Sequence, residues 1–316
     1  MPLNYDALTT TTEKYYLKPL VDNVFNATVL LRKLSADADP AEGGEKLKQP
    51  LIYAENSAAG SYSKYDILST TPSDELTAAL FAWKQLYCNV SISGLEEAQN
   101  RGARAVLNLV KSKMQVAELT LKKLMTTQLF SDGTGNSGKD ITGIHAAIDD
   151  GTNVATYGEI DRTTYTWWKA KRYANGGVDR VPTLTLMQTA YGSISDDTEF
   201  PDLIVTTQTI WDWYWAQLTP QQRYENEQRS ANVGFRHLMF NQTPIIVDKA
   251  CTAKRMYMIN TKYLKLRPHE ENAGKFRQTG WKKPTNQDAA VNQMLWYGNL
   301  TCSNCSKQAV IEDLAP

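Results

Sequence analysis

Three groups of residues have the types and spacing that binding or catalytic sites use, and the first is a glycine-rich loop. Residues 133–138 read GTGNSG and fit G-x-G-x-x-G, and with Lys139 they come close to the phosphate pattern G-x-x-x-x-G-K-[ST]. Both patterns hold phosphates where the loop follows a strand and opens a helix, because backbone amides then face the anion. Here the loop follows a predicted helix, and Asp140 stands where Ser or Thr is required. The sequence favours a structural turn at Gly133–Lys139 over a nucleotide site.

Cys302 and Cys305 form the second group, with the C-x-x-C spacing that can place two thiolates on one zinc ion or form a redox pair. A closed zinc site needs two more ligands, but Cys88, Cys251 and the three histidines stand alone in the sequence. A single C-x-x-C is therefore a weak indication of metal or redox chemistry, and we expect no cofactor. Cys88 lies on the apolar side of a predicted strand, which is typical of a small core residue.

The third group is aromatic. Trp211, Trp213, Tyr214 and Trp215 could stack on bases or sugars if they were exposed. However, Trp211, Tyr214 and Trp215 fall at i, i+3 and i+4 on one helix face, a spacing that favours core packing. Because the sequence holds no G-x-S-x-G or H-E-x-x-H motif and no Ser, His and Asp grouping, we expect no enzyme.

Composition narrows the class of protein further. The 316 residues correspond to roughly two domains, and 42% hydrophobic with 22% charged residues is an ordinary globular composition. Lys plus Arg and Asp plus Glu are both 34, so the chain lacks the basic excess typical of proteins that neutralise nucleic-acid phosphates. No apolar stretch approaches the ~20 residues that span a bilayer, and the start has no signal-peptide pattern. We therefore expect a cytoplasmic protein with reduced cysteines and no membrane partner.

The elements that position these groups begin with a helix predicted over about residues 19–33 and a linker over 36–44. Residues 47–54 predict a strand, and residues 86–93 predict a second one because apolar and polar side chains alternate there. Between them, residues 55–75 are rich in Ser, Thr, Gly and Pro. The pattern predicts two long antiparallel strands joined by a projecting, irregular tip.

A very long helix follows. Apolar residues recur at spacings of three or four over 103–128, which predicts a helix of roughly 39 Å whose apolar stripe includes Val110, Met114 and Leu121. After the glycine-rich loop, residues 183–260 alternate between helical and strand patterns and predict an α/β domain. The tail predicts further strands that could form a sheet against the long helix. The predicted elements after residue 183 are helices at 184–192 and 208–217 and strands at 203–206, 235–240, 244–247, 256–260, 263–267, 290–296 and 308–311.

The order of these elements resembles the Hong Kong 97-type major capsid protein of tailed bacteriophages. The resemblance covers nearly the whole chain from about residue 14, and it rests on the order and spacing of its motifs more than on any single one. The stretches that carry it are Leu86–Gly94 (LYCNVSISG), Phe130–Gly143 (FSDGTGNSGKDITG), Leu203–Thr207 (LIVTT), Gly234–Asp248 (GFRHLMFNQTPIIVD) and Tyr257–Leu266 (YMINTKYLKL).

The resemblance implies an α+β subunit with four parts. They are an N-terminal arm at 1–45, an extended loop at 46–85, a peripheral domain on a spine helix at 86–158 and 265–316, and an axial domain at 159–264. It also implies self-assembly into pentamers and hexamers of an icosahedral shell around phage double-stranded DNA, without sequence-specific binding. A portal protein, a separate scaffolding protein and a possible decoration protein are the implied partners, with assembly in the host bacterial cytoplasm and a final location in the virion capsid.

Two sets of residues are expected to contact neighbouring subunits. Lys64 and Tyr65 lie near the predicted loop tip; some relatives cross-link such a lysine to an asparagine, but no matching Glu can be assigned here, so that chemistry is not carried over. The polar loop 219–232 carries Arg223 and Arg229 against Glu225 and Glu227, so their charges sum to zero. Neighbouring copies of this loop could pair Arg with Glu around a five- or six-fold axis, or the loop could simply be solvated. Changing both arginines to Glu is expected to impair capsomer formation if the pairing exists.

Two other functions remain open at this point. A bacterial nanocompartment shell, similar to encapsulins, would have the same fold and would enclose cargo enzymes in place of a genome. A nucleotide-binding enzyme using the Gly133–Lys139 loop is the less favoured alternative, and a nucleotide binding assay would distinguish it from both shells.

Overall fold

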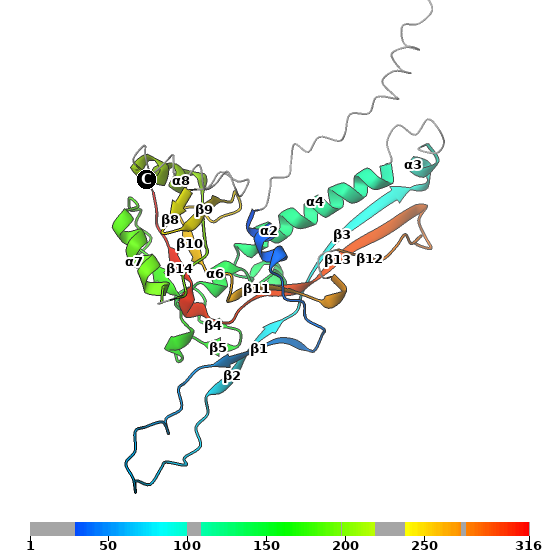
Figure 1. Cartoon of the computed structure of the whole chain (residues 1–316). Helices are drawn as coiled ribbons and strands as arrows, with labels where there is room; N and C mark the ends of the chain where they lie inside the picture. Colours follow the sequence, from blue (N-terminus) through cyan, green and yellow to red (C-terminus); the bar gives the residue numbers. More distant parts are fainter. Residues whose placement is uncertain (1–28, 100–108, 197, 219–237, 273–275, 316) are drawn as a thin grey trace, which may run out of the picture.

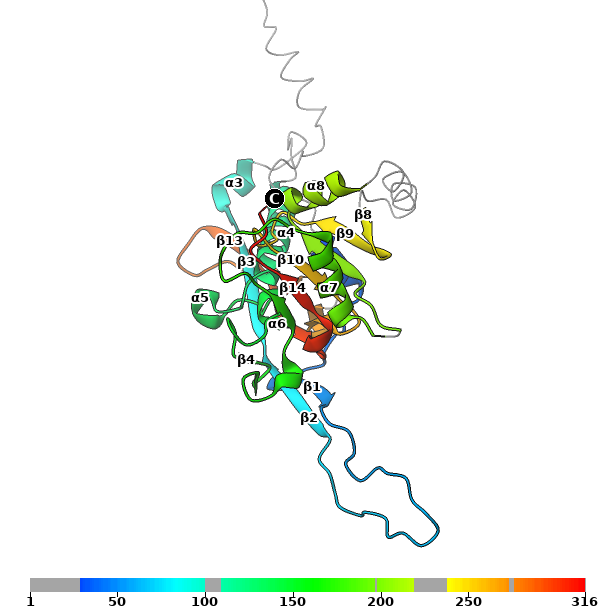
Figure 2. The same cartoon turned by 90° about the vertical axis from the view of Figure 1, so that its left-hand side faces the viewer.

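The computed structural model describes residues 29–99, 109–196, 198–218, 238–272 and 276–315. Within them, a long helix lies along one sheet, a second sheet with its own helices lies beside it, and a hairpin projects away from both (Figure 1). A view turned by 90° shows the same hairpin extending well beyond the body of the molecule (Figure 2).

The long helix α4 spans Leu109–Leu129, which is about 31 Å at 1.5 Å per residue. It lies along a four-stranded sheet that contains β3 (Lys84–Ser93) and three tail strands. The centre of this sheet is β13 (Ala289–Cys302), which pairs antiparallel with β3, β11 (Leu264–Pro268) and β12 (Arg277–Gln278). The expectation that tail strands supply the sheet for the long helix is confirmed.

The buried stripe of α4 differs in part from the predicted one. Leu121 is 1% exposed and Met114 is half-buried against the core, as expected, but Val110 and Leu124 are both 38% exposed. The buried positions advance in steps of four along the C-terminal half of the helix, because only that half lies between two layers of the protein. The fully buried apolar residues of this stripe are Ala117, Leu121, Met125 and Leu129.

We expect Leu121→Ala to lower the free energy of unfolding by about 2–5 kcal/mol, because it empties space in a packed core. Lys122→Gln, one residue further, is the matched control. Its ammonium group makes only a half-exposed i,i+4 ion pair with Glu118 at 2.7 Å, so its loss is expected to cost less than about 1 kcal/mol. Urea unfolding of both variants checks this, and an equal loss would show that the stripe is misassigned.

The projecting hairpin consists of β1 (Lys46–Ile52) and β2 (Leu76–Ala82), paired antiparallel from Lys46 opposite Ala82 to Ile52 opposite Leu76. The predicted pairing of strand 47–54 with strand 86–93 is therefore wrong. The alternating strand is β3, whose buried face is needed under α4, so it pairs with β13 instead. The chain passes from the hairpin to that sheet at Trp83, between β2 and β3.

The base of the hairpin is attached to the body at the turn between β4 (Thr156–Tyr157) and β5 (Ile160–Asp161). The Leu80 amide donates to the Gly158 carbonyl oxygen at 2.9 Å. A Cβ atom at Gly158 would lie 2.8 Å from the Ala79 Cβ, and its φ of +61° also favours glycine. Glycine at this position therefore allows the close approach that holds the hairpin base.

The second sheet has six strands in the order β6-β14-β10-β7-β9-β8. Its outer strand β6 and its second strand β14 come from far apart in the sequence, because β14 belongs to the tail. The strands are β6 (Lys171–Tyr173), β14 (Ala309–Ile311), β10 (Met256–Ile259), β7 (Leu203–Thr206), β9 (Thr243–Val247) and β8 (Leu238–Phe240).

Successive residues of these strands point into two different cores. Ile204 packs with helices α7 (Leu184–Ile194) and α8 (Gln208–Gln217), while Val205 packs with the larger core that includes α4. Both faces of the sheet are therefore buried, which explains why its strands have continuous apolar sequences.

The aromatic residues of α8 belong to the smaller core. Tyr214 is 3% exposed, and Trp211 and Trp215 stack with ring centroids 5.8 Å apart while packing partly buried against that core. The prediction of core packing is confirmed.

The remaining elements are short, and no helix among the described residues is long and apolar enough to cross a membrane. Most of the helix predicted at 19–33 lies outside the described residues. Its described part begins at Val29 and is helical, and this helix continues to Ala36. These elements are α2 (Val29–Ala36), α3 (Gly94–Gln99), α5 (Gly135–Gly138), α6 (Ile144–Ala147), η1 (Thr166–Trp168), η2 (Glu270–Asn272) and η3 (Cys305–Lys307).

Candidate assembly site

The tip of the hairpin, residues 53–75, holds Lys64 and Tyr65, and both are exposed. Its hydrogen bonds are local: the Ser63 amide donates to the Asp66 carboxylate at 2.7 Å, and the Asp66 amide donates to the Ser63 carbonyl oxygen at 3.0 Å. Tyr65 is 95% exposed and Ile67 is 99% exposed. Apolar side chains held away from the body on a protruding loop are typical of an interaction surface.

The other predicted contact residues, Arg223, Glu225, Glu227 and Arg229, lie outside the described residues. Their pairing around a symmetry axis stays a prediction.

The glycine-rich loop follows α4, and the side chain of its own residue Asp140 lies inside the loop. Asp140 accepts hydrogen bonds from the side-chain amides of Gln128 at 2.8 Å and Asn136 at 2.7 Å, so a negative charge occupies the place that a phosphate would need. A Cβ at Gly143 would lie within 2.5 Å of the backbone oxygens of Ser131, Gln128 and Leu129. The loop is a tight turn that follows the C-terminal end of α4, which agrees with the structural turn that the sequence favours.

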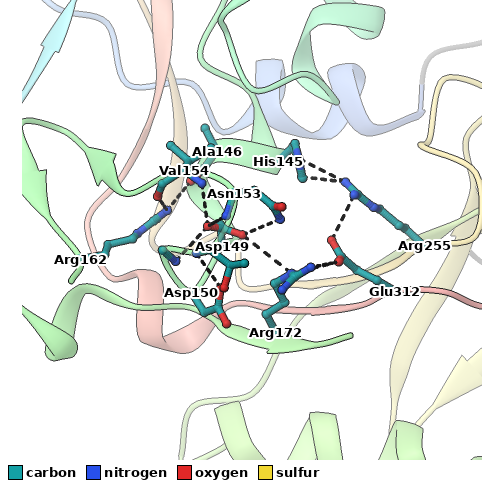
Figure 3. A network of polar contacts seen from close by, with 12 residues as sticks. His145, Ala146, Asp149, Asp150, Asn153, Val154, Arg162, Arg172, Arg255 and Glu312 are labelled. Atoms are coloured by element: carbon teal, nitrogen blue, oxygen red, sulfur yellow. Dashed lines mark hydrogen bonds and ion pairs between the residues drawn. The ribbon is translucent and has the colours of Figure 1, made fainter. Parts of the chain in front are cut away.

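A chain of buried ionic contacts joins the six-stranded sheet to the segment that follows the loop (Figure 3). Glu312, directly after β14, forms ion pairs with Arg172 at 2.7 Å and with Arg255 at 3.2 Å, and its side chain is 5% exposed. Arg255 also donates to His145 Nδ1 at 2.7 Å. Arg172 continues the chain to the Asp149 carboxylate at 3.9 Å.

Asp149 shapes the backbone at the end of this chain. It is fully buried and accepts from the amides of Gly151, Asn153 and Val154 at 2.9–3.1 Å. The network therefore forms a junction between the six-stranded sheet, at β6, β10 and β14, and residues 145–154.

Acid is expected to weaken this junction through His145. Burial, followed by the adjacent Arg255 charge, lowers the pKa of His145 below its usual value of 6.5. The unfolded chain then binds the proton more readily, so the stability contribution is complete above about pH 6.5 and is lost as pH falls toward the folded-state pKa.

His145→Gln removes this titration while keeping an acceptor for Arg255. Thermal unfolding of both proteins between about pH 7.5 and pH 5 checks the effect, and the wild type is expected to lose more stability on acidification across the unfolded-state pKa of about 6.5. Parallel curves for the two proteins would contradict it.

The four cysteines are free thiols. Cys88 is half-buried against the larger core, as expected, while Cys302 and Cys305 are fully buried. No group of three or more metal-ligating side chains occurs in the described part of the chain. The Arg162 side chain, which is 0% exposed, contacts the Cys305 sulfur.

Neither Arg162 nor the network of ionic contacts around Glu312 was predicted from the sequence. Its members are single charged residues separated by up to about 170 positions, so no spacing pattern marks them. The one available signal was that Glu312 follows an apolar strand directly, a place where a charge needs a partner.

No protein-family model matches the chain, and no curated protein matches it. Several solved structures do match over nearly its full length. The capsid asymmetric unit of cyanophage A-1(L) is 15% identical with a TM-score of 0.74, covering 95% of this chain and 96% of that chain. The capsid of the native GTA particle is 12% identical with a TM-score of 0.66, covering 99% and 100%.

An encapsulin also matches. The holo-SrpI encapsulin complex from Synechococcus elongatus PCC 7942 is 9% identical with a TM-score of 0.62, covering 99% of this chain and 96% of that chain. Two of these three structures are capsids, and the third is an encapsulin complex. These matches cover nearly the whole length of each chain, and the chain therefore has the Hong Kong 97-type capsid fold.

Proposed function

We propose that the chain is the major capsid protein of a tailed phage and assembles into the pentamers and hexamers of an icosahedral shell. The observation that carries this proposal is the hairpin. Its tip exposes Tyr62, Tyr65, Ile67 and Leu68 by 59–99% on a subunit whose fold is that of capsids. A two-stranded extension is marginal by itself in water, so a neighbouring subunit that covers its tip explains why it projects.

The division into parts follows from the same proposal. Residues 1–45 would form the arm, 46–85 the extended loop, 86–158 with 265–316 the peripheral domain, and 159–264 the axial domain that faces the symmetry axes. The tail also contributes β14 to the six-stranded sheet, so the two domains share a strand across their boundary.

The shell would enclose double-stranded DNA without a specific site. The net charge of zero suits a container, because like-charged subunits packed at high density would repel one another. A portal protein, a separate scaffolding protein and a possible decoration protein would complete the assembly, which would form in the host cytoplasm and persist as the virion capsid.

A nanocompartment shell is the second candidate, and the encapsulin match over 99% of the chain favours it specifically. The higher TM-score of the cyanophage capsid, 0.74 against 0.62, leads us to place the phage capsid first.

Electron microscopy of the expressed protein tests the shell function that both candidates share. Closed particles built from five- and six-membered rings are expected, and a monomer that stays monomeric at high concentration with or without a scaffolding protein would contradict both. The contents of particles isolated from the native producer then separate the candidates. Nuclease-protected double-stranded DNA would support the phage capsid, while an enzyme cargo without DNA would overturn it in favour of the nanocompartment.

A further inference from the structure

Arg162 is a fully buried cation that has no carboxylate partner within the described parts of the chain. All five of its N–H groups are used: four donate to the backbone oxygens of Ala146, Ala147, Val154 and Trp168 at 2.7–3.4 Å. The guanidinium also lies 4.9 Å from the centre of the Tyr157 ring. Among the described residues, no carboxylate oxygen lies within 4.0 Å of its nitrogens. Asp149, the buried carboxylate of the neighbouring network, is engaged by backbone amides and Arg172.

The fifth donor of Arg162 points to a thiol. Its Nη2 lies 3.5 Å from Cys305 Sγ, and both residues are 0% exposed. A buried charge is costly unless an opposite charge or hydrogen bonds compensate it. Among the residues that the structure describes, Cys305 is the one ionisable group that hydrogen-bonds to this guanidinium. Cys302, three residues earlier, is also 0% exposed and belongs to the same buried core.

We propose that Cys305 is held as a thiolate by Arg162 and that Cys302 and Cys305 form a peroxide-sensitive dithiol that closes reversibly into a disulfide. The C-x-x-C turn keeps the two sulfurs together, with Cys302 ending β13 and Cys305 starting η3. This proposal does not depend on which kind of shell the chain builds.

Titration behaviour agrees with this geometry. Burial raises the pKa of both thiols, but in Cys305 the hydrogen bond from Cys302 and the Arg162 charge outweigh burial and lower the pKa. In Cys302, burial and the neighbouring Cys305 raise the pKa well above its usual value. One thiolate and one thiol are the two forms that disulfide chemistry needs.

The step balances with hydrogen peroxide as the oxidant. The Cys305 thiolate attacks one peroxide oxygen, the O–O bond breaks, and sulfenic acid and water result once a proton is taken up. The Cys302 sulfur then attacks the Cys305 sulfur, loses its proton and expels the oxygen as a second water. Two protein thiols are oxidised by two electrons, and one peroxide is reduced to two water molecules.

A small oxidant can reach the pair through its own turn. The turn residues Ser303, Asn304 and Ser306 are half-buried, although both sulfurs are covered. Ser306 also lines an open pocket of about 510 Å³ together with Arg172. A local opening of this turn exposes Cys305 without unfolding the sheets.

Peptide mass spectrometry after peroxide treatment of the full chain tests the proposal without any substitution. Trypsin releases residues 283–307 as one peptide that holds both cysteines and neither of the others. We expect this peptide to lose two hydrogens and regain them with dithiothreitol, at a rate at least about tenfold above the oxidation of Cys251, which is the internal control. Burial raises the pKa of Cys251 to about 12, so it should react slowly.

Two variants identify the roles of the sulfurs. In Cys302→Ser, the sulfenic acid at Cys305 should persist and react with dimedone, and no disulfide should form. In Cys305→Ser, the ultraviolet thiolate absorbance of the wild type between about pH 8 and pH 6 should disappear. Peptide 283–307 that stays reduced while Cys251 oxidises, or thiolate absorbance that survives in Cys305→Ser, would overturn the proposal.

Discussion

Deletion of residues 56–72 is expected to leave a folded subunit that no longer closes into shells. The deletion removes the exposed apolar side chains of the tip but keeps the β1–β2 ladder, including Ile52 opposite Leu76. The Tyr53 amide also keeps its bond to the Glu75 carbonyl oxygen at 3.0 Å, so Glu55 and Ser73 can be joined by a short turn. Because both cores lie away from the tip, stability should change little while contacts between subunits are lost.

Sedimentation and electron microscopy measure this outcome directly. The double substitution Tyr65→Ser and Ile67→Ser is a milder companion, because these side chains are 95% and 99% exposed and contribute nothing to the fold of the single chain. It should weaken assembly while the thermal unfolding curve stays unchanged. Closed particles of normal size from the deletion variant would show that the hairpin does not join subunits.

Glu312→Gln is expected to cost about 3–5 kcal/mol of unfolding free energy, because it removes one partner of buried ion pairs. The Glu312 carboxylate is 5% exposed and lies between Arg172 and Arg255, whose side chains are only 17% and 21% exposed. An amide cannot compensate two guanidinium groups, so two charges would remain in a poorly solvated site. Urea unfolding with an unchanged m-value would measure the loss.

The matched control is Asp179→Asn. Asp179 pairs with Lys254 at 2.6 Å, but both side chains are about half exposed, so solvent screens the pair and its loss should cost less than about 1 kcal/mol. Equal small losses in both variants would mean that the ionic chain does not hold the six-stranded sheet to residues 145–154.

Periodicity predicted most elements, because it depends on residues that are close in sequence. The helix at 208–217 and the strand at 203–206 have the predicted bounds, and α4 ends one residue after the predicted position. Strand pairing was predicted less well. Nothing in residues 47–54 indicates whether their partner is Leu76–Ala82 or Lys84–Ser93, because the two candidate strands are separated by a single residue.

The buried polar residues could not be predicted for a different reason. Arg162 compensates its charge with backbone oxygens that the fold brings together, and a backbone oxygen has no sequence signal. The C-x-x-C pair was visible in the sequence, but its chemistry depends on an arginine 143 positions away. The projecting tip at residues 55–75 was predicted from its polar composition, which is a local property.

The order of strands also determines when the protein can fold during its synthesis. The central strand of one sheet, β13, and the second strand of the other, β14, both lie within residues 289–311, far behind β3 and β6 in the sequence. Until the ribosome has released these residues, β3 has no partner and β6 is detached from β10. A chain that has been synthesised only as far as β11 therefore cannot complete either sheet, so both sheets form only after residues 289–311 have been made.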